Sequence, residues 1–166
     1  MGDAEFAGTA IVMPTKPVSD TIELDLGGRK LKLSPHSTAH TDNDLTILDE
    51  LTGTLILGDL AFVGRVPTID GSIVGWLKVI SELRSQTVAR VVPGHGPPSL
   101  AMDAALDPLE RYMTAIANDV RAAIKAGDTL SQATETVALG EKDNWLLFDE
   151  HHKRNVTAAF AELEWE

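Results

Sequence analysis

The chain has 166 residues, 43% of them hydrophobic, which is enough for one compact domain with its own core. Its formal net charge of −11 argues against a nucleic-acid partner, because phosphate binding relies on clustered Lys and Arg side chains. The sequence has no cysteine, which excludes disulfides, thiolate nucleophiles and cysteine-type zinc sites. Any bound metal must therefore take His and carboxylate ligands.

Membrane association is not expected. No apolar run approaches the roughly 20 residues that cross a bilayer, and the first ten residues lack the basic and apolar regions of a signal peptide. We therefore expect a soluble chain without a membrane partner. The compartment stays open between cytoplasm and periplasm, because a longer precursor could carry a secretory signal.

The first third of the chain predicts β-strands. Residues 9–14 form an apolar run that favours a strand. Residues 21–26 and 30–34 alternate apolar and polar side chains on either side of Gly27-Gly28, a pattern that predicts a hairpin.

A second hairpin and a crossover connection follow. Residues 44–50 and 54–59 are apolar runs separated by the turn-like residues 51–53. Apolar residues repeat at spacings of three and four over residues 72–84, which predicts an amphipathic helix, and residues 89–96 predict a short buried strand. Strand, helix and strand in this order imply a crossover connection.

The remainder is predicted to be helical. Asp107-Pro108 is a suitable N-cap and first turn for a helix that Gly127 ends. Thr129 and Gln132 have the spacing of a capping box, and a last amphipathic helix is expected over residues 149–163.

The whole chain, residues 1–166, is therefore expected to form a single domain. Its core is predicted over residues 9–98, and a helical C-terminal region over residues 107–164. No repeat, linker or low-complexity tract divides the sequence.

Three polar residues lie where a predicted strand ends or a loop begins. His40 precedes the strand at 44–50, Asp59 ends the strand at 54–59, and His95 stands in the sequence Val-Pro-Gly-His-Gly. Imidazole and carboxylate together suit zinc, iron or manganese, and glycine beside a ligand lets backbone approach closely. Each residue alone is as well explained by a surface role or a turn, so the prediction of a metal site depends on the combination.

The contexts of these residues resemble the later motifs of the metallo-β-lactamase superfamily. The matching stretches, in order, are HTDNDLTIL, LILGDLAF and VVPGHG. The resemblance implies the C-terminal half of an αββα sandwich, an α/β fold of the α+β type with one sheet and helices on one face. It also implies zinc, one or two ions in the complete site, with His40 on the first metal, Asp59 as the bridging and catalytic carboxylate, and His95 on the second.

A narrower resemblance is to the quinoprotein relay system zinc metallohydrolases. It rests on Gly64-Arg65-Val66-Pro67, on Gly75-Trp76 and on the ending RNVTAAFAELEWE. This subgroup implies a periplasmic setting. The superfamily implies hydrolysis of an ester, thioester or amide-like bond in a small-molecule substrate that the sequence does not identify.

The sequence departs from the superfamily at one point. Members carry a His-X-His-X-Asp-His motif before the position of His40, and this chain has none, since no histidine precedes His36. We do not expect His36 or the adjacent pair His151-His152 to replace it, and Asp42 and Asp44 favour solvated loop carboxylates over supports for the ligands. The chain is therefore expected to be a truncated hydrolase that is inactive or poorly active alone.

Removing half of a sandwich should leave an apolar sheet face uncovered, so we expect self-association, for example as a symmetric dimer. The alternative function is a non-catalytic interaction or oligomerisation module that retains half of the fold. A third interpretation is a redox iron protein related to the flavodiiron proteins, although the sequence has no flavin-binding signal.

Overall fold

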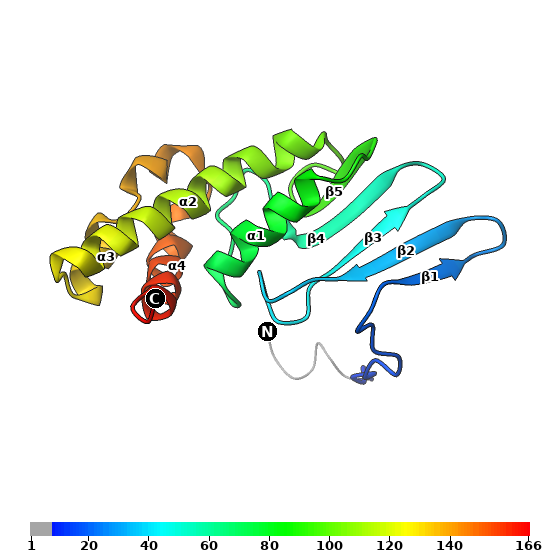
Figure 1. The fold of residues 1–166 in the computed structure, drawn as a ribbon, viewed down its shortest axis with the longest axis horizontal. Helices are drawn as coiled ribbons and strands as arrows, with labels where there is room; N and C mark the ends of the chain where they lie inside the picture. Colours follow the sequence, from blue (N-terminus) through cyan, green and yellow to red (C-terminus); the bar gives the residue numbers. More distant parts are fainter. Residues whose placement is uncertain (1–7) are drawn as a thin grey trace.

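The computed structural model describes residues 8–166, which form one five-stranded sheet and a layer of helices (Figure 1). The strands, in chain order and in sheet order, are β1 (Ile22–Asp25), β2 (Lys30–Pro35), β3 (Leu45–Asp49), β4 (Thr54–Phe62) and β5 (Arg90–His95). The helices are α1 (Ile73–Arg84), α2 (Met102–Ala126), α3 (Leu130–Thr136), the 3-10 helix η2 (Leu139–Asn144) and α4 (Phe148–Leu163).

The two predicted hairpins are confirmed. Gly27 and Gly28 join β1 to β2 with φ angles of 84° and 93°, a left-handed conformation that glycine adopts without strain. The Asp25 carboxylate accepts hydrogen bonds from both of their backbone N–H groups, at 2.9 and 2.8 Å. The β3–β4 turn contains Gly53 at φ 62°. Strands β1 to β4 therefore form an antiparallel meander.

The predicted crossover is also confirmed. Strand β5 pairs with β4 in parallel, and α1 connects the two. The side chain of Ser72 caps α1 by accepting a hydrogen bond from the Gly75 N–H at 2.9 Å. Four residues of its predicted apolar face are buried, namely Ile73, Trp76, Ile80 and Leu83. The fifth predicted residue, Leu77, is half-buried, and Val79 is buried in addition.

Residues 9–14 do not form the predicted strand. They lie outside the five-stranded sheet, and the side chains of Ile11 and Val12 are 92% and 87% exposed. An apolar run becomes a strand only where its backbone joins the hydrogen-bonded ladder of a sheet, and residues 9–14 belong to none of the five strands.

Helix α2 begins earlier than predicted, at Met102 instead of at Asp107-Pro108. Ala105 and Leu106 are fully buried, so packing against the core extends the helix towards the N-terminus. Pro108 lies inside the helix and removes one backbone hydrogen bond near its start. Asp107 does not cap the helix and instead pairs with Arg84 at 2.6 Å. The predicted end at Gly127 and the capping box of α3 are confirmed.

One face of the sheet carries the core. The helices cover this face, where Leu55 and Val91 are 1% and 0% exposed and stand next to one another in the parallel register. Helix α2 packs against α1 and α4 as well as against β4 and β5. The core is therefore concentrated at the β4–β5 side of the sheet, while β1 and β2 extend away from the helices (Figure 1).

The other face of the sheet is uncovered by helices, and we call it the open face. One aliphatic side chain from each strand lies in a single cross-sheet row on it: Ile22, Leu33, Ile47, Ile56 and Val92. None of the five is buried, and Ile56 is 39% exposed. The expected uncovered apolar face is therefore present.

A buried polar network joins the helices. The Nδ1 atom of His152 lies 3.1 Å from the Tyr112 hydroxyl, and its Nε2 atom lies 2.9 Å from the Val137 carbonyl oxygen. The Asn155 amide donates to the Tyr112 hydroxyl at 3.0 Å and to the Pro67 carbonyl at 2.7 Å. This network connects α2, α4 and the segment after α3 to the loop that follows β4.

None of the helices within residues 8–166 has the length and apolar character needed to span a membrane.

The His152 network predicts a loss of stability in mild acid. Burial lowers the pKa of His152 below its usual value near 6.5, so the unfolded chain binds the proton more readily than the folded chain. Neutral His152 contributes fully to the free energy of unfolding above about pH 6.5, the usual pKa of histidine in an unfolded chain. This contribution decreases as the pH falls towards the lower pKa of His152 in the folded chain. We expect the urea midpoint to decrease between pH 7.5 and pH 5, and to decrease less in His152→Gln than in the control His151→Gln.

The two carboxylates that pair with Arg29 and Arg111 do not account for a change in that pH range. The hydrogen bond from Arg29 holds the pKa of Asp49 at about 2, and the hydrogen bond from Arg111 lowers the pKa of Glu141. Both groups therefore stay ionised down to pH 5. If the urea midpoint of His152→Gln decreased with pH as much as that of His151→Gln, this role for His152 would be contradicted.

Candidate metal centre

The three predicted ligands come together at one end of the sheet. The Nε2 atom of His40 lies 3.7 Å from Asp59 Oδ2, and the Nε2 atom of His95 lies 3.5 Å from Asp59 Oδ1. Each imidazole faces a different oxygen of the same carboxylate. The loop before β3, the strand β4 and the end of β5 supply one residue each, so three segments far apart in the sequence meet at the Asp59 carboxylate.

The ring of His40 is oriented by a second hydrogen bond. Its Nδ1 atom lies 2.7 Å from the carbonyl oxygen of Thr68, which can only accept, so the proton must be on Nδ1. In the neutral imidazole the lone pair is then on Nε2, the atom that faces Asp59. Metal-binding histidines in proteins are commonly oriented in this way, with the distant ring nitrogen donating to a carbonyl or carboxylate.

The backbone around His40 is held by the segment that leads into α1. The Asp70 N–H donates to the His40 carbonyl at 3.1 Å, and the Ser72 N–H donates to the Ala39 carbonyl at 2.9 Å. Glycine permits this close approach, because a Cβ atom on Gly71 would lie 3.0 Å from the Thr41 carbonyl oxygen and one on Gly75 would overlap the Thr38 carbonyl oxygen. The start of α1 therefore fixes the position of His40.

Asp44 supports the same loop, but not the histidine itself. Its carboxylate accepts hydrogen bonds from the N–H and from the hydroxyl of Thr41, both at 2.9 Å. Asp42 is exposed and interacts with Asn43. Both carboxylates shape the loop, and no contact between either of them and a predicted ligand is present.

Asp59 and His95 are placed by an irregular part of the β4–β5 ladder. The register between the two strands shifts on either side of Gly58, which has a φ of 55°. Such a bulge redirects a side chain. A Cβ atom on Gly94 would overlap Asp59 Oδ1 and lie 2.7 Å from the Gly58 carbonyl carbon, so only glycine leaves room for the carboxylate.

Two aromatic side chains border the centre. The ring of Phe62 stacks on that of His95, with centroids 4.5 Å apart, and lies 5.6 Å from the ring of His40. The indole of Trp76 lies 5.3 Å from His40, and its Nε1 atom donates to the Leu60 carbonyl at 3.0 Å. Phe62 and Trp76 are buried, so one side of the centre is apolar and inaccessible to water.

These donors fit part of a zinc site, but not a complete one. Two ligands on one tetrahedral zinc ion, each bound at about 2.0 to 2.2 Å, are roughly 3.3 Å apart, which is close to the observed separations. The types of donor and the orientation of His40 also fit. However, no group of three or more His, Cys, Asp or Glu side chains between residues 8 and 166 is arranged to hold a metal ion. Each carboxylate oxygen has a single imidazole beside it.

The remaining histidines lie in other contacts. The Nε2 atom of His36 lies 2.8 Å from the Thr46 hydroxyl, and burial lowers the pKa of His36. Both ring nitrogens of His152 are occupied in the helical network. His151 lies on α4.

Two features of the candidate centre, the Thr68 carbonyl and Phe62, were not predicted from the sequence. The position of a backbone carbonyl does not depend on the type of residue that carries it, and a single Phe in a sequence cannot be told apart from an ordinary core residue.

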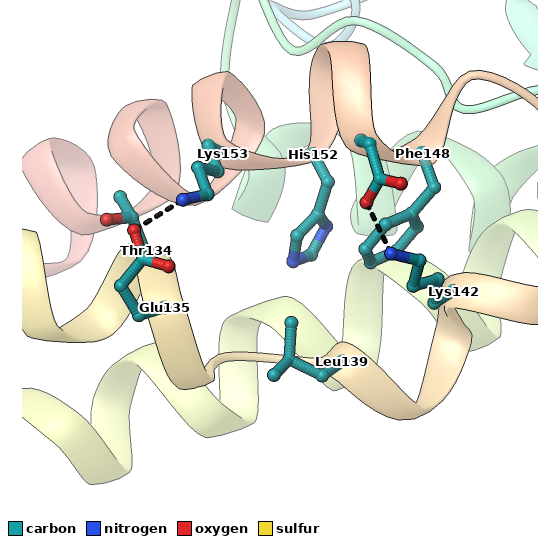
Figure 2. Close-up of a pocket in the computed structure, with 8 residues that line it drawn as sticks. Thr134, Glu135, Leu139, Lys142, Phe148, His152 and Lys153 are labelled. Atoms are coloured by element: carbon teal, nitrogen blue, oxygen red, sulfur yellow. Dashed lines mark hydrogen bonds and ion pairs between the residues drawn. The ribbon is translucent and has the colours of Figure 1, made fainter.

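A cavity of about 300 Å³ lies in the helical layer, among α3, η2 and α4, and contains none of the predicted ligands (Figure 2). The His152 ring forms one wall and stacks on Phe148, with centroids 4.0 Å apart. Lys142 pairs with Asp149 at 2.8 Å, and Lys153 pairs with Glu135. The four charged side chains that line this cavity are therefore paired with one another.

The sequence profile of the metallo-beta-lactamase superfamily matches residues 2–95, a range that contains all three predicted ligands. This chain therefore belongs to the metallo-beta-lactamase superfamily. No match was found among curated proteins.

Solved structures have the same fold. The chain is similar to a stereoselective inverting sec-alkylsulfatase from Pseudomonas sp., with a TM-score of 0.68 and 16% identity over 92% of this chain and 26% of that one. It is also similar to a metallo-beta-lactamase family protein from Thermus thermophilus, with a TM-score of 0.65 and 17% identity over 90% of this chain and 48% of that one.

A third similar structure is a metallo-beta-lactamase from Pontibacter korlensis, with a TM-score of 0.56 and 18% identity over 67% of this chain and 54% of that one. The chain thus spans between about a quarter and about half of the length of these proteins. At this identity the likeness concerns the fold, and the structure is a partial metallo-beta-lactamase fold.

The packing around Asp59 predicts that Gly94→Ala is destabilising. The added methyl group would overlap the carboxylate and the Gly58 backbone, and overpacking of this kind costs about 1 to 3 kcal/mol. Gly140→Ala is the matched control, because a Cβ atom added there would meet no atom within 4 Å. Urea denaturation measures both variants. Equal stability of the two would show that β4 and β5 are less closely packed at Asp59 than described.

Proposed function

We propose that this chain provides part of the active centre of a zinc-dependent hydrolase, with His40, Asp59 and His95 as its metal ligands. The observation that carries the proposal is the orientation of His40, whose proton on Nδ1 leaves Nε2 free to face Asp59. A surface histidine has no need of such a constraint. The membership of the superfamily supports the hydrolytic class of reaction.

In this proposal each residue has a definite role. His40 and His95 would each offer one imidazole nitrogen, and Asp59 would bridge with its two carboxylate oxygens. Bound zinc would lower the pKa of a water molecule and polarise the substrate. Phe62 and Trp76 would keep water from one side of the centre, which strengthens electrostatic interactions there. The proposed substrate is a small molecule with an ester, thioester or amide-like bond.

The proposed centre needs further ligands. A catalytic zinc site has three protein ligands and one open position, and each Asp59 oxygen has only one imidazole beside it. We propose that the missing ligands come from a segment with the His-X-His-X-Asp-His motif that this sequence lacks, and that the chain alone has little activity. The narrower resemblance to the quinoprotein relay system zinc metallohydrolases, with its periplasmic setting, stays a prediction.

Zinc titration tests the ligand assignment. In calorimetry, we expect the chain to bind zinc weakly, and we expect His40→Ala, Asp59→Ala and His95→Ala each to weaken that binding at least about tenfold, because each removes a donor. His151→Ala is the control, since it removes a histidine of α4. An N-terminal segment with the missing motif should strengthen zinc binding when it is added.

Two results would contradict the assignment. One is unchanged zinc affinity in all three ligand variants, and the other is unchanged zinc content after the segment is added. Elemental analysis of the purified chain separates zinc from iron and so tests the redox alternative.

The second candidate function, a non-catalytic interaction module, is favoured by the open face. Five aliphatic side chains in one cross-sheet row are exposed or half-buried, although burial of such surface stabilises proteins by about 25 cal/mol per Å². We propose that a second copy of the chain covers this face in a symmetric dimer, because an apolar row is complementary to itself. This proposal is independent of zinc binding.

A charge on the open face should prevent the dimer. We expect Ile56→Asp to make the chain monomeric, because the carboxylate would be buried without a partner in the interface. Val74→Asp on α1 is a matched control, because the exposed fractions of Ile56 and Val74 are 39% and 40%. Sedimentation velocity at micromolar concentration measures the change. A monomeric wild-type chain under these conditions would rule out the dimer.

A further inference from the structure

Helix α4 carries a buried asparagine that binds the loop between β4 and α1. Asn155 is 0% exposed and lies on the last helix of the chain. Its Oδ1 atom accepts a hydrogen bond from the Ile69 N–H at 3.0 Å, and its Nδ2 atom donates to the Pro67 carbonyl at 2.7 Å. These two backbone groups lie on either side of Thr68, whose carbonyl accepts from the ring of His40. The asparagine therefore holds the residue that orients a proposed ligand.

One peptide group connects the two side chains. The Thr68 carbonyl and the Ile69 N–H belong to the same peptide group, which is planar, with its C=O and N–H bonds pointing in opposite directions in the trans form. The C=O end lies 2.7 Å from His40 Nδ1, and the N–H end donates to Asn155 Oδ1. A rigid plane thus stands between the asparagine and the histidine, and each side chain holds one end of it.

The orientation of the Asn155 amide follows from its partners. A backbone N–H can only donate and a carbonyl oxygen can only accept, so the amide oxygen must face Ile69 and the amide nitrogen must face Pro67. The amide nitrogen also donates to the Tyr112 hydroxyl at 3.0 Å, and Tyr112 is 0% exposed. Rotation of the amide would break these hydrogen bonds inside the core, where water cannot replace them. The support for the peptide group is therefore itself fixed.

Further contacts tie the same loop to α4. The Glu162 carboxylate accepts from the Ser72 hydroxyl at 2.6 Å. Arg154 pairs with Asp70, whose N–H donates to the His40 carbonyl at 3.1 Å. These contacts hold the backbone of the loop and of His40, whereas the buried asparagine holds the peptide group that bonds to the imidazole. The position of the loop and the orientation of the ring therefore have separate supports.

The hydrogen bond at the N–H end also strengthens the C=O end. Hydrogen bonds in a chain polarise one another, so the Thr68 carbonyl becomes a better acceptor when the N–H of its peptide group is bonded. A better acceptor at Nδ1 makes the distant ring nitrogen of His40 more basic, and that nitrogen is the atom that faces Asp59. The asparagine thus acts on the donor strength of the histidine as well as on its geometry.

We propose that Asn155 is a positioning residue for the candidate metal centre, which acts on His40 through the peptide group between Thr68 and Ile69. It holds the ring in place and keeps the proton of the neutral ring on Nδ1. This effect on the ring requires no metal, and its consequence for zinc binding rests on the proposed function. The alternative is that Asn155 only satisfies buried backbone groups, in which case its loss lowers stability without changing the ring.

The tautomer of His40 tests the proposal without metal. Nuclear magnetic resonance spectra that correlate ring protons with ring nitrogens show which nitrogen carries the proton. They are recorded on the whole chain with EDTA at pH 8, above the usual pKa of histidine. We expect the Nδ1–H form in the wild type and a mixture with the Nε2–H form in Asn155→Leu, because leucine keeps the shape of the side chain and removes its hydrogen bonds.

Two further variants separate positioning from stability. Tyr112→Phe is the matched control, because it removes a buried hydrogen bond from Asn155 but leaves the bonds to Pro67 and Ile69; it should lower stability and leave the His40 tautomer unchanged. Asn155→Asp keeps an acceptor for the Ile69 N–H and loses the donor to Pro67. It should therefore give less of the Nε2–H form than Asn155→Leu.

Zinc affinity is the second readout. In calorimetry we expect Asn155→Leu to weaken zinc binding about threefold, less than the tenfold or greater loss that is typical when a group bonded directly to a metal ligand is removed, because the other contacts of the loop remain. Tyr112→Phe should leave the affinity unchanged.

An unchanged His40 tautomer in folded Asn155→Leu overturns the proposal and leaves the ligand assignment intact. If that variant does not fold, the wild type decides: the Nε2–H form, or an Ile69 N–H that exchanges with solvent as fast as an exposed amide, overturns the proposal, and the Nδ1–H form with a protected Ile69 N–H supports it. A changed tautomer in Asn155→Leu together with failure of the zinc titration of the ligand variants contradicts the proposed function alone.

Discussion

Parallel pairing of β4 with β5 is the interaction on which the candidate centre depends. It places Asp59 beside the end of β5, and the register shift around Gly58 turns the carboxylate towards His95. Parallel strands require a crossover, and the start of α1, at the end of that crossover's first loop, holds His40 through backbone hydrogen bonds. One topological feature therefore fixes all three of the residues that we propose as ligands.

The uncovered sheet face and the small number of donors at the candidate centre occur in the same molecule. The sheet packs helices on one face and leaves an aliphatic row on the other, and the chain spans about half of the length of two solved structures to which it is similar. In the proposal above, further ligands for the metal come from outside this sequence, and the open face is covered by a second copy of the chain. The helical side, in contrast, has a dense core and a satisfied polar network around Asn155.

The local pattern predicted much of the fold. Both hairpins, the crossover, the capping box of α3 and the end of α2 at Gly127 follow from residue type and spacing. The errors have a common cause. Residues 9–14 lie outside the five-stranded sheet, and α2 begins before Pro108 because Ala105 and Leu106 are buried. Long-range packing decided both cases, and no local signal reports it.

For the candidate site too, some features follow from the sequence and others only from the tertiary structure. The sequence by itself determined the chemical types of the donors, their order in the chain and the glycines that flank them, because these are properties of residues and spacing. Only the tertiary structure decided that Nε2 of His40 faces Asp59 and that Phe62 stacks on His95. Those facts depend on a backbone carbonyl, a bulge and the packing of distant segments, and such contacts exist only once the chain has folded.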